Sequence, residues 1–157
     1  MATPHPSHHA RWRQIMSGQA RHITVVAALV RDPDGRLLLV RKRGTQRYIQ
    51  PGGKPDLGEE VTTTAAREVA EETGLNLDPD RFTTMGTIHT NAANEPDHTL
   101  TAHCVSVCLN YLEASHVSAA AEIEEAVWVS PQQAMSMPVA PLLHDHILPA
   151  ILTPTTP

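Results

Sequence analysis

The sequence is poor in aromatic residues, in cysteine and in positive charge, and it has no long apolar run. Aromatic side chains make up 3% of its 157 residues, so an extensive stacking surface for bases is not expected. Lysine and arginine number 12 against 17 acidic residues, a net charge of −5, which argues against a protein that grips a nucleic-acid backbone. An anionic substrate would need another partner, and a divalent cation is the obvious candidate.

Two further absences concern the compartment. No apolar run reaches the roughly 18 residues of a membrane span, and the N-terminus lacks the apolar core of a signal peptide. The two cysteines, Cys104 and Cys108, lie on the same face of a predicted strand but too far apart along it to form a disulfide. We therefore expect two buried reduced thiols, no membrane partner and a cytoplasmic protein.

Length and composition fit one globular domain. Hydrophobic residues make up 41% and charged residues 18% of the chain, which is typical of a folded soluble protein. We interpret residues 1–22, which are polar and contain several histidines, as a flexible leader. Residues 23–152 form the predicted domain and residues 153–157 a short tail.

Hydrophobic patterning predicts an α+β fold. The β-branched run at 23–30 is typical of a strand buried on both faces, and a Pro/Asp-Gly turn joins it to a second strand at 36–44 as a hairpin. An extended piece is predicted at 48–50, and further strands at 82–90, 99–112 and 126–130. Helices are predicted at 60–73, before a glycine suited to the C-terminal cap, at 131–136, beginning with proline, and at 138–152. This order favours a mixed sheet covered by helices.

The helix predicted at 60–73 gathers acidic side chains on one face. At about 100° per residue, Glu68, Glu71 and Glu72 share an arc with Arg67, while small apolar residues fill the opposite face. Like charges at these spacings destabilise a helix slightly, and glutamates near its C-terminus oppose the helix dipole. Acidic faces are usually only solvated, but bound Mg²⁺ or Mn²⁺ would remove both penalties.

The residues before this helix decide between the two interpretations. From Gly53 the chain reads glycine, five residues, Glu59, seven residues, Arg67-Glu68-Val69, one residue, Glu71-Glu72, one residue, Gly74-Leu75. These nine positions over 23 residues resemble the complete signature of the Nudix (MutT-like) hydrolase family. The preceding "YIQPGGK" also resembles the family, and the likeness extends over residues 23–152.

The resemblance implies a Nudix α/β/α sandwich with a mixed β-sheet and a metal-dependent hydrolase of nucleoside diphosphate derivatives. It implies that Glu68, Glu71 and Glu72 bind Mg²⁺, for which Mn²⁺ can substitute, together with the backbone carbonyl of Gly52. It further implies that Arg67 orients these carboxylates and that Glu59 supports them from the start of the helix. The remaining signature positions are expected to be structural, namely Gly53, Val69, Gly74 and Leu75.

The family often adds one acid shortly before a Trp-Val strand. Glu122 is our choice and Glu125 the next, although a solvated loop acid fits the sequence equally well. One glutamate among Glu68, Glu71, Glu72 and Glu122 is expected to accept the proton of the attacking water. Members of the family differ in which one does so, and the sequence leaves this open.

Basic and aromatic residues near the Pro-Gly-Gly segment are candidates for substrate binding. Arg41 and Arg43 follow the second strand and are expected to contact phosphates or to form a solvated cluster at a sheet edge. Tyr48 is expected to stack on a base or to cap the core. Gly53 and Lys54 would lie at the phosphates, with Lys54 assisting the leaving group; a plain loop lysine is the alternative.

The substrate class is the least determined feature. The short chain resembles family members that cleave a nucleoside triphosphate, oxidised or modified forms included, to the monophosphate and pyrophosphate. Where ADP-ribose-type subgroups carry a proline this chain has His89, and the tyrosine of dinucleoside-polyphosphate subgroups is also missing. Alternatives are an ADP-ribose or nucleotide-sugar pyrophosphatase, a non-catalytic nucleotide sensor, which would usually have lost signature glutamates, and an isoprenoid-diphosphate isomerase. The expected partner is a small nucleotide and not a nucleic-acid polymer, and a homodimer is left open.

Overall fold

A mixed β-sheet forms the centre of the computed structural model, which describes residues 22–93 and 96–153. Its strands are β1 (His22–Arg31), β2 (Leu37–Lys42), β3 (Gly52–Gly53), β4 (Thr83–Asn91), β5 (Thr99–Cys108) and β6 (Ile123–Val129). The order across the sheet is β4-β5-β1-β2-β6, with β3 paired to β1. Only the β1–β5 pair is parallel among these described strands. The predicted α+β fold with a mixed sheet is confirmed.

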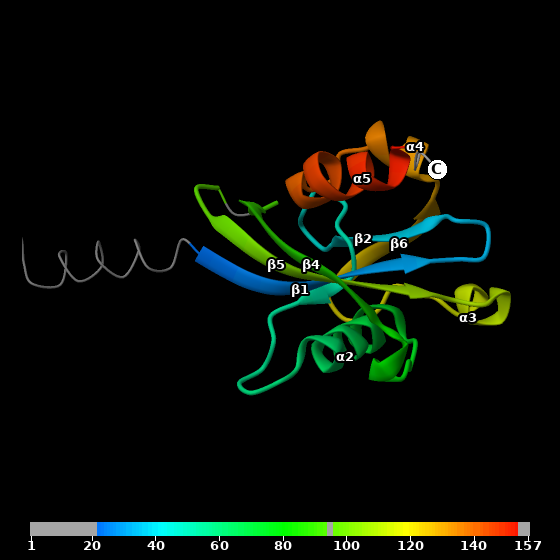
Figure 1. Ribbon diagram of the computed structural model, residues 1–157. Helices are drawn as coiled ribbons and strands as arrows, with labels where there is room; N and C mark the ends of the chain where they lie inside the picture. Colours follow the sequence, from blue (N-terminus) through cyan, green and yellow to red (C-terminus); the bar gives the residue numbers. More distant parts are fainter. Residues whose placement is uncertain (1–21, 94–95, 154–157) are drawn as a thin grey trace, which may run out of the picture.

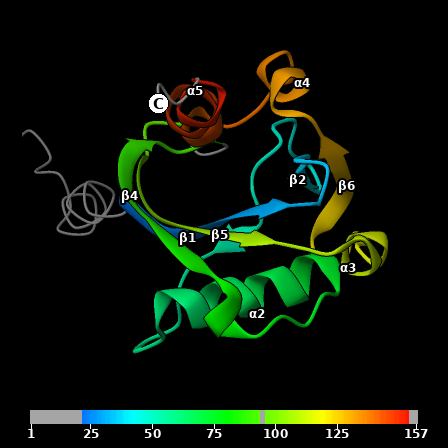
Figure 2. The ribbon, with the colours of Figure 1, turned by 45° about the vertical axis from the view of Figure 1, so that its right-hand side comes forward.

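Helices cover both faces of the sheet (Figures 1 and 2). One face carries α2 (Val61–Thr73), and the other carries α4 (Pro131–Met135), the π-helical segment η2 (Leu142–Ile147) and α5 (Leu148–Leu152). The short α3 (Tyr111–Ser115) follows β5, and the 3-10 turn η1 (Pro79–Arg81) precedes β4. The layers are therefore helix, sheet and helix. No helix in the described part of the chain is both long and apolar enough to cross a membrane.

The alternation of β1 divides the core into two halves. Val26, Ala28 and Val30 are buried among residues of α2 such as Ala65 and Val69. The intervening residues of the same strand are buried on the other side, against η2 and α5; they are Ala27 and Leu29, with Leu143, Ile147 and Leu148. Successive side chains of a strand point to opposite faces. The apolar run is therefore buried on both faces of the sheet, as the sequence predicts. α2 is thereby fixed against the centre of the sheet.

The strand predicted at 99–112 ends four residues early, and this prediction was wrong. Asn110 caps α3: its side chain accepts a hydrogen bond from the Glu113 N–H at 2.8 Å, and the Glu113 carboxylate accepts one from the Asn110 N–H at 3.0 Å. This reciprocal capping box starts a helix in preference to extending the strand. As a result Cys108 is exposed, contrary to expectation, while Cys104 is buried. Burial raises the pKa of the Cys104 thiol to about 11.

Two other boundaries differ because of pairing between distant segments. β6 begins at Ile123 and not at residue 126, because Lys42 at the end of β2 still offers it a partner. The helix predicted from residue 138 begins only after an extended stretch in which Val139 pairs with Tyr48. Ile49 in turn bonds Val40 of β2 in both directions, at 2.8 Å each. The segment before Pro51 is therefore held from both sides, which fixes the position of β3.

Candidate active site

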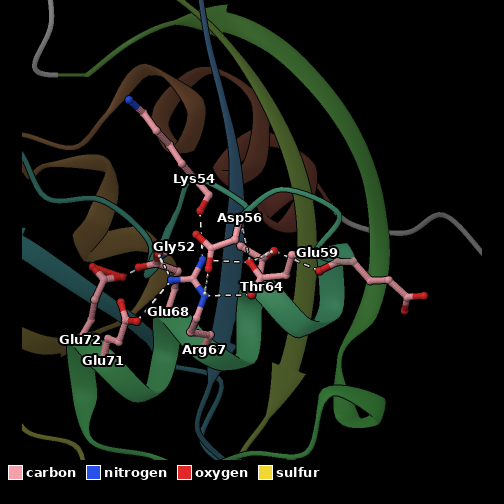
Figure 3. Close-up of polar contacts among 10 residues, drawn as sticks. Gly52, Lys54, Asp56, Glu59, Thr64, Arg67, Glu68, Glu71 and Glu72 are labelled. Atoms are coloured by element: carbon pink, nitrogen blue, oxygen red, sulfur yellow. Dashed lines mark hydrogen bonds and ion pairs between the residues drawn. The ribbon is translucent and has the colours of Figure 1, made fainter.

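Arg67 of α2 lies at the centre of a hydrogen-bond network (Figure 3). Its Nε and Nη2 donate to the two carboxylate oxygens of Glu59, at 2.9 Å each. Its Nη1 donates to Glu68 at 2.9 Å and to Glu71 at 3.3 Å, and Nη2 also reaches the carbonyl of Lys54 at 3.1 Å. Hydrogen bonding, above all to Glu59, raises the pKa of Arg67. One guanidinium thus joins the loop after β3, the start of α2 and two acids of the helix.

Glu59 is the most fully hydrogen-bonded acid of this network. Besides Arg67, it accepts hydrogen bonds from the Thr64 hydroxyl at 2.7 Å and from the Asp56 N–H at 3.1 Å. These donors, Arg67 first, lower the pKa of Glu59 to about 2. Hydrogen bonds to the charged form of an acid favour that form. Glu59 therefore stays ionised near neutral pH and anchors Arg67.

Glu68 is buried against the backbone of β3. A Cβ placed on Gly53 would lie 2.5 Å from the carboxyl carbon of Glu68, so glycine is needed there to leave room for the carboxylate. Burial raises the pKa of Glu68 although Arg67 opposes the shift. The result is a carboxylate with raised proton affinity beside the Gly-Gly segment, a suitable state for accepting a proton.

Glu72, one turn further along α2, is completely buried. Its Oε1 accepts a hydrogen bond from the Gly52 N–H at 2.7 Å, whereas its Oε2 has no hydrogen-bond partner among the described residues. Desolvation raises the pKa of Glu72 to about 8, and the nearby charges of Glu68 and Glu122 contribute in the same direction. Gly52 must be glycine, because a Cβ there would overlap the carbonyl oxygen of Val26.

These acids fit a divalent cation by the type of their donors and by the unpartnered oxygen of Glu72. A buried carboxylate oxygen without a partner is costly, and a hard cation would remove that cost with the oxygen ligands it prefers. Within the described ranges no three acidic, histidine or cysteine side chains already surround one point. Glu71 is instead half exposed and hydrogen-bonded to Arg67.

Glu122 reaches the site through a loop that is bound to the end of α2. The Ser118 N–H donates to the carbonyl of Thr73 at 3.1 Å, and the Ala120 N–H donates to that of Glu72 at 3.0 Å. Ala121 then takes a left-handed conformation with φ of 52°, which is uncommon for a residue other than glycine. The backbone of the loop thus places Glu122 beside Glu68 and Glu72, with which it interacts electrostatically.

A cavity of about 440 Å³ opens beside these residues, a size typical of small-molecule sites. Its lining includes charged side chains and the two glycines of β3, namely Lys42, Gly52, Gly53, Lys54, Glu68 and Glu122. It also includes aliphatic side chains, namely Ile23, Val25, Ile49, Leu100 and Leu142. No aromatic side chain is among the described residues that line it. The cavity therefore offers charged groups for phosphates and aliphatic groups for a neutral part of a ligand.

The structure does not bring Arg41, Arg43 and Tyr48 to this cavity. Tyr48 donates from its hydroxyl to Glu125 at 2.7 Å, and Arg41 contacts the same carboxylate at 3.5 Å, so Glu125 also lies away from the site. Arg43 pairs with the exposed Glu124 at 3.3 Å.

Lys42 is the basic residue of this segment that lines the cavity. An irregularity in the pairing with β6 lies between Arg41 and Lys42, and β2 ends at Lys42, so Arg43 is already in the turn. Sequence reasoning missed Lys42, because this irregularity depends on the partner strand. Lys54 lines the cavity as well, but its ammonium extends away from the carboxylates (Figure 3).

Comparison with known proteins gives one family. The family model described as NUDIX domain matches residues 20–151. A "MutT-like protein" of Streptomyces ambofaciens is 42% identical over 62 residues, which are 40% of this chain and 40% of that protein. The "m7GpppN-mRNA hydrolase NUDT17" of Danio rerio is 40% identical over 62 residues, 36% of this chain and 21% of that protein. The alignments thus span less than half of these relatives.

Solved structures share the fold at low sequence identity. A MutT protein from Methanosarcina mazei has a TM-score of 0.65 at 24% identity, covering 82% of this chain and 91% of its own. The NUDIX domain of Shewanella oneidensis NrtR, solved with ADP ribose, has a TM-score of 0.64 at 18% identity, with coverages of 90% and 95%. At these identities the likeness concerns the fold alone.

Replacing Glu59 by glutamine should lower stability at neutral pH and lower it less at pH 3. Because the pKa of Glu59 is lowered to about 2 from an ordinary value of 4.5, its contribution is complete above pH 4.5 and is lost as the pH falls towards 2. Urea unfolding of both proteins at pH 7 and pH 3 measures this. A difference in the free energy of unfolding that is as large at pH 3 as at pH 7 would contradict the assignment.

Glu72→Gln should stabilise the metal-free protein in alkali. The pKa of Glu72 is raised to about 8, so the wild type loses stability as the pH rises from 4.5 through 8, whereas glutamine stays neutral. Each pKa unit corresponds to about 1.4 kcal/mol. In EDTA at pH 8.5 we therefore expect the Tm of the variant to be higher by at least about 3 °C.

Adding Mg²⁺ should reverse this order. Ligand binding to the native state raises Tm, and the wild type should gain more than the variant, which has lost a charged ligand. Glu124→Gln, at an exposed acid, should behave as the wild type. An equal Mg²⁺-induced rise in Tm for Glu72→Gln and the wild type would remove Glu72 from the metal site.

Proposed function

The chain belongs to the Nudix hydrolase family, and we propose that it is a Mg²⁺-dependent pyrophosphohydrolase that cleaves a diphosphate linkage in a nucleoside diphosphate derivative. The preferred substrate class is a nucleoside triphosphate, oxidised or modified forms included, cleaved to the monophosphate and pyrophosphate. The observation that carries this proposal is the cavity, whose lining combines glutamates and lysines with aliphatic side chains. A nucleotide likewise combines charged phosphates with a neutral base.

Glu68 is our choice for the residue that accepts the proton of the attacking water. It lines the cavity beside the Gly-Gly segment, and burial raises its pKa in the metal-free protein. Glu122 is the other glutamate that lines the cavity. Glu71 is hydrogen-bonded to Arg67 outside the lining, and Arg67 keeps both Glu68 and Glu71 oriented from the helix.

Charge at the phosphates is balanced by cations from two sources. Mg²⁺, held by Glu68, Glu71, Glu72 and the carbonyl of Gly52, would offset charge on phosphate oxygens and lower the pKa of a bound water. Lys42 comes from β2 and Lys54 from the loop after β3, on the cavity side of each. Mn²⁺, with similar ligand preferences, can substitute.

The names of relatives and the ligand of a neighbour indicate which substrates should be tested. One relative's name gives it an mRNA cap as substrate and one structural neighbour holds ADP ribose, so family membership leaves the leaving group open. The cationic side chains among the described residues that line the cavity are Lys42, Lys54 and Arg67, and Arg67 is hydrogen-bonded to the neighbouring acids. Two remaining lysines favour a neutral base over a second phosphorylated group, and hence triphosphates over dinucleoside polyphosphates.

Glu68→Gln should reduce hydrolysis by at least about 100-fold, the usual contribution of general-base catalysis. Release of phosphate and pyrophosphate is measured with Mg²⁺ and with Mn²⁺ on canonical and oxidised nucleoside triphosphates, ADP-ribose, nucleotide sugars and dinucleoside polyphosphates. Glu124→Gln serves as the control for an exposed acid. A Glu68→Gln variant of undiminished kcat would exclude Glu68 as base, and an inactive wild type that still binds these nucleotides would favour a sensor.

Lys42→Ala should raise KM for the best substrate of that panel by about tenfold or more, whereas Arg43→Ala should leave KM within about twofold. A hydrogen bond between charged groups contributes about 1.5–3 kcal/mol, and only Lys42 lines the cavity. The two variants remove neighbouring positive charges from one strand, so a general effect of net charge would change both alike. A rise in KM for Arg43→Ala alone would restore the prediction made from sequence.

A further inference from the structure

Gln50 is a buried polar residue at the cavity that the chemistry described so far does not use. It is 4% exposed and lies among the residues that line the cavity. Its Nε2 is buried without a hydrogen-bond partner in the described part of the chain. In the same part of the protein only the Oε2 of Glu72 shares this state, and that oxygen belongs to the metal-binding acids.

An unpartnered buried amide is costly for the protein. Leaving a buried donor unsatisfied costs about 1–3 kcal/mol, and an apolar residue of similar size would avoid this cost. The lining of the cavity includes aliphatic side chains, among them Ile23, Ile49 and Leu142. A ligand group that accepts the hydrogen bond would recover the cost, so the carboxamide is suited to a partner that comes from outside the chain.

The backbone that carries Gln50 is held rigidly. Ile49 exchanges two hydrogen bonds with Val40, and the carbonyl of Pro51 accepts one from the Ala28 N–H at 2.8 Å. The residue is therefore fixed between two paired positions, while the last torsion of a glutamine side chain is soft. The amide can turn towards a ligand without movement of the main chain.

We propose that Gln50 is a specificity-determining residue, whose carboxamide N–H donates a hydrogen bond to an acceptor atom on the nucleobase of the bound nucleotide. The inference rests on the proposed function, since it places the phosphates at Lys42 and Glu68 and the base against the aliphatic residues. A site that offers a buried donor rejects ligands that lack an acceptor at that position, because the donor is then left unpaired. Gln50 would thereby select among bases in a cavity whose described lining has no aromatic residue.

Binding of AMP, GMP, CMP and UMP to the metal-free protein in EDTA tests this inference by calorimetry. We expect the wild type to prefer one base, and Gln50→Met to bind that nucleotide about tenfold to 100-fold more weakly, with the four affinities brought closer together. Methionine conserves the volume and flexibility of the side chain. Gln46→Met, a change at an exposed glutamine outside the cavity, is the matched control and should bind as the wild type does.

The Tm of Gln50→Met separates recognition from a structural role. Removing an unpartnered buried amide should leave the Tm of the ligand-free protein equal or higher. A lower Tm with an unchanged order of bases would overturn the proposal, as would a wild type that distinguishes no base in either affinity or kcat/KM. Base-selective binding without hydrolysis would overturn the hydrolase function and keep Gln50 as the residue that selects the base. Hydrolysis with the same order of bases in Gln50→Met and the wild type would keep the hydrolase function and overturn the role of Gln50.

Discussion

The paired hydrogen bonds between Arg67 and Glu59 are the interaction on which the rest of the site depends. They fix the guanidinium beside the start of α2. Its other hydrogen bonds then reach Glu68, Glu71 and the carbonyl of Lys54. Lysine in place of Arg67 would carry the same charge but lacks the planar fork that serves these partners together. Glu59 remains ionised, and Glu59, Glu68 and Glu71 stay close to one another because a fixed positive charge lies among them.

The two faces of α2 have different roles: one carries the acids and the other packs on the sheet. The acidic face carries a penalty, since burial opposes the charge of Glu68 and Glu72. The other face packs small and branched side chains such as Ala65 and Val69 against β1, and this contact keeps the helix in place. Close packing also brings Gly52 and Gly53 near α2: a side chain at Gly52 would overlap the carbonyl of Val26, and one at Gly53 would displace the carboxylate of Glu68. The packing of α2 on the core thus offsets the energetic cost of burying Glu68 and Glu72.

The sequence predicted what local rules determine and missed what depends on pairing between distant segments. Periodicity located β1, β2 and α2, and the signature spacing located Arg67 and the glutamates that α2 brings together. The end of β5 at Cys108 was missed although a local capping box marked it. The contact of Val139 with Tyr48 and the early start of β6 have no local signal, because each depends on a partner strand. Lys42 was overlooked and the neighbouring arginines were favoured because the irregularity between Arg41 and Lys42 also depends on the pairing with β6.

The charged and the aliphatic residues that line the cavity come from different parts of the chain. The acids belong to α2 and to the loop bound to its last turn, whereas the aliphatic residues belong to the start of β1, the segment before Pro51, β5 and η2. A substitution at Ile23, Gln50 or Leu142 touches none of the hydrogen bonds of Arg67. The aliphatic part of the lining can therefore change while the carboxylates keep their positions.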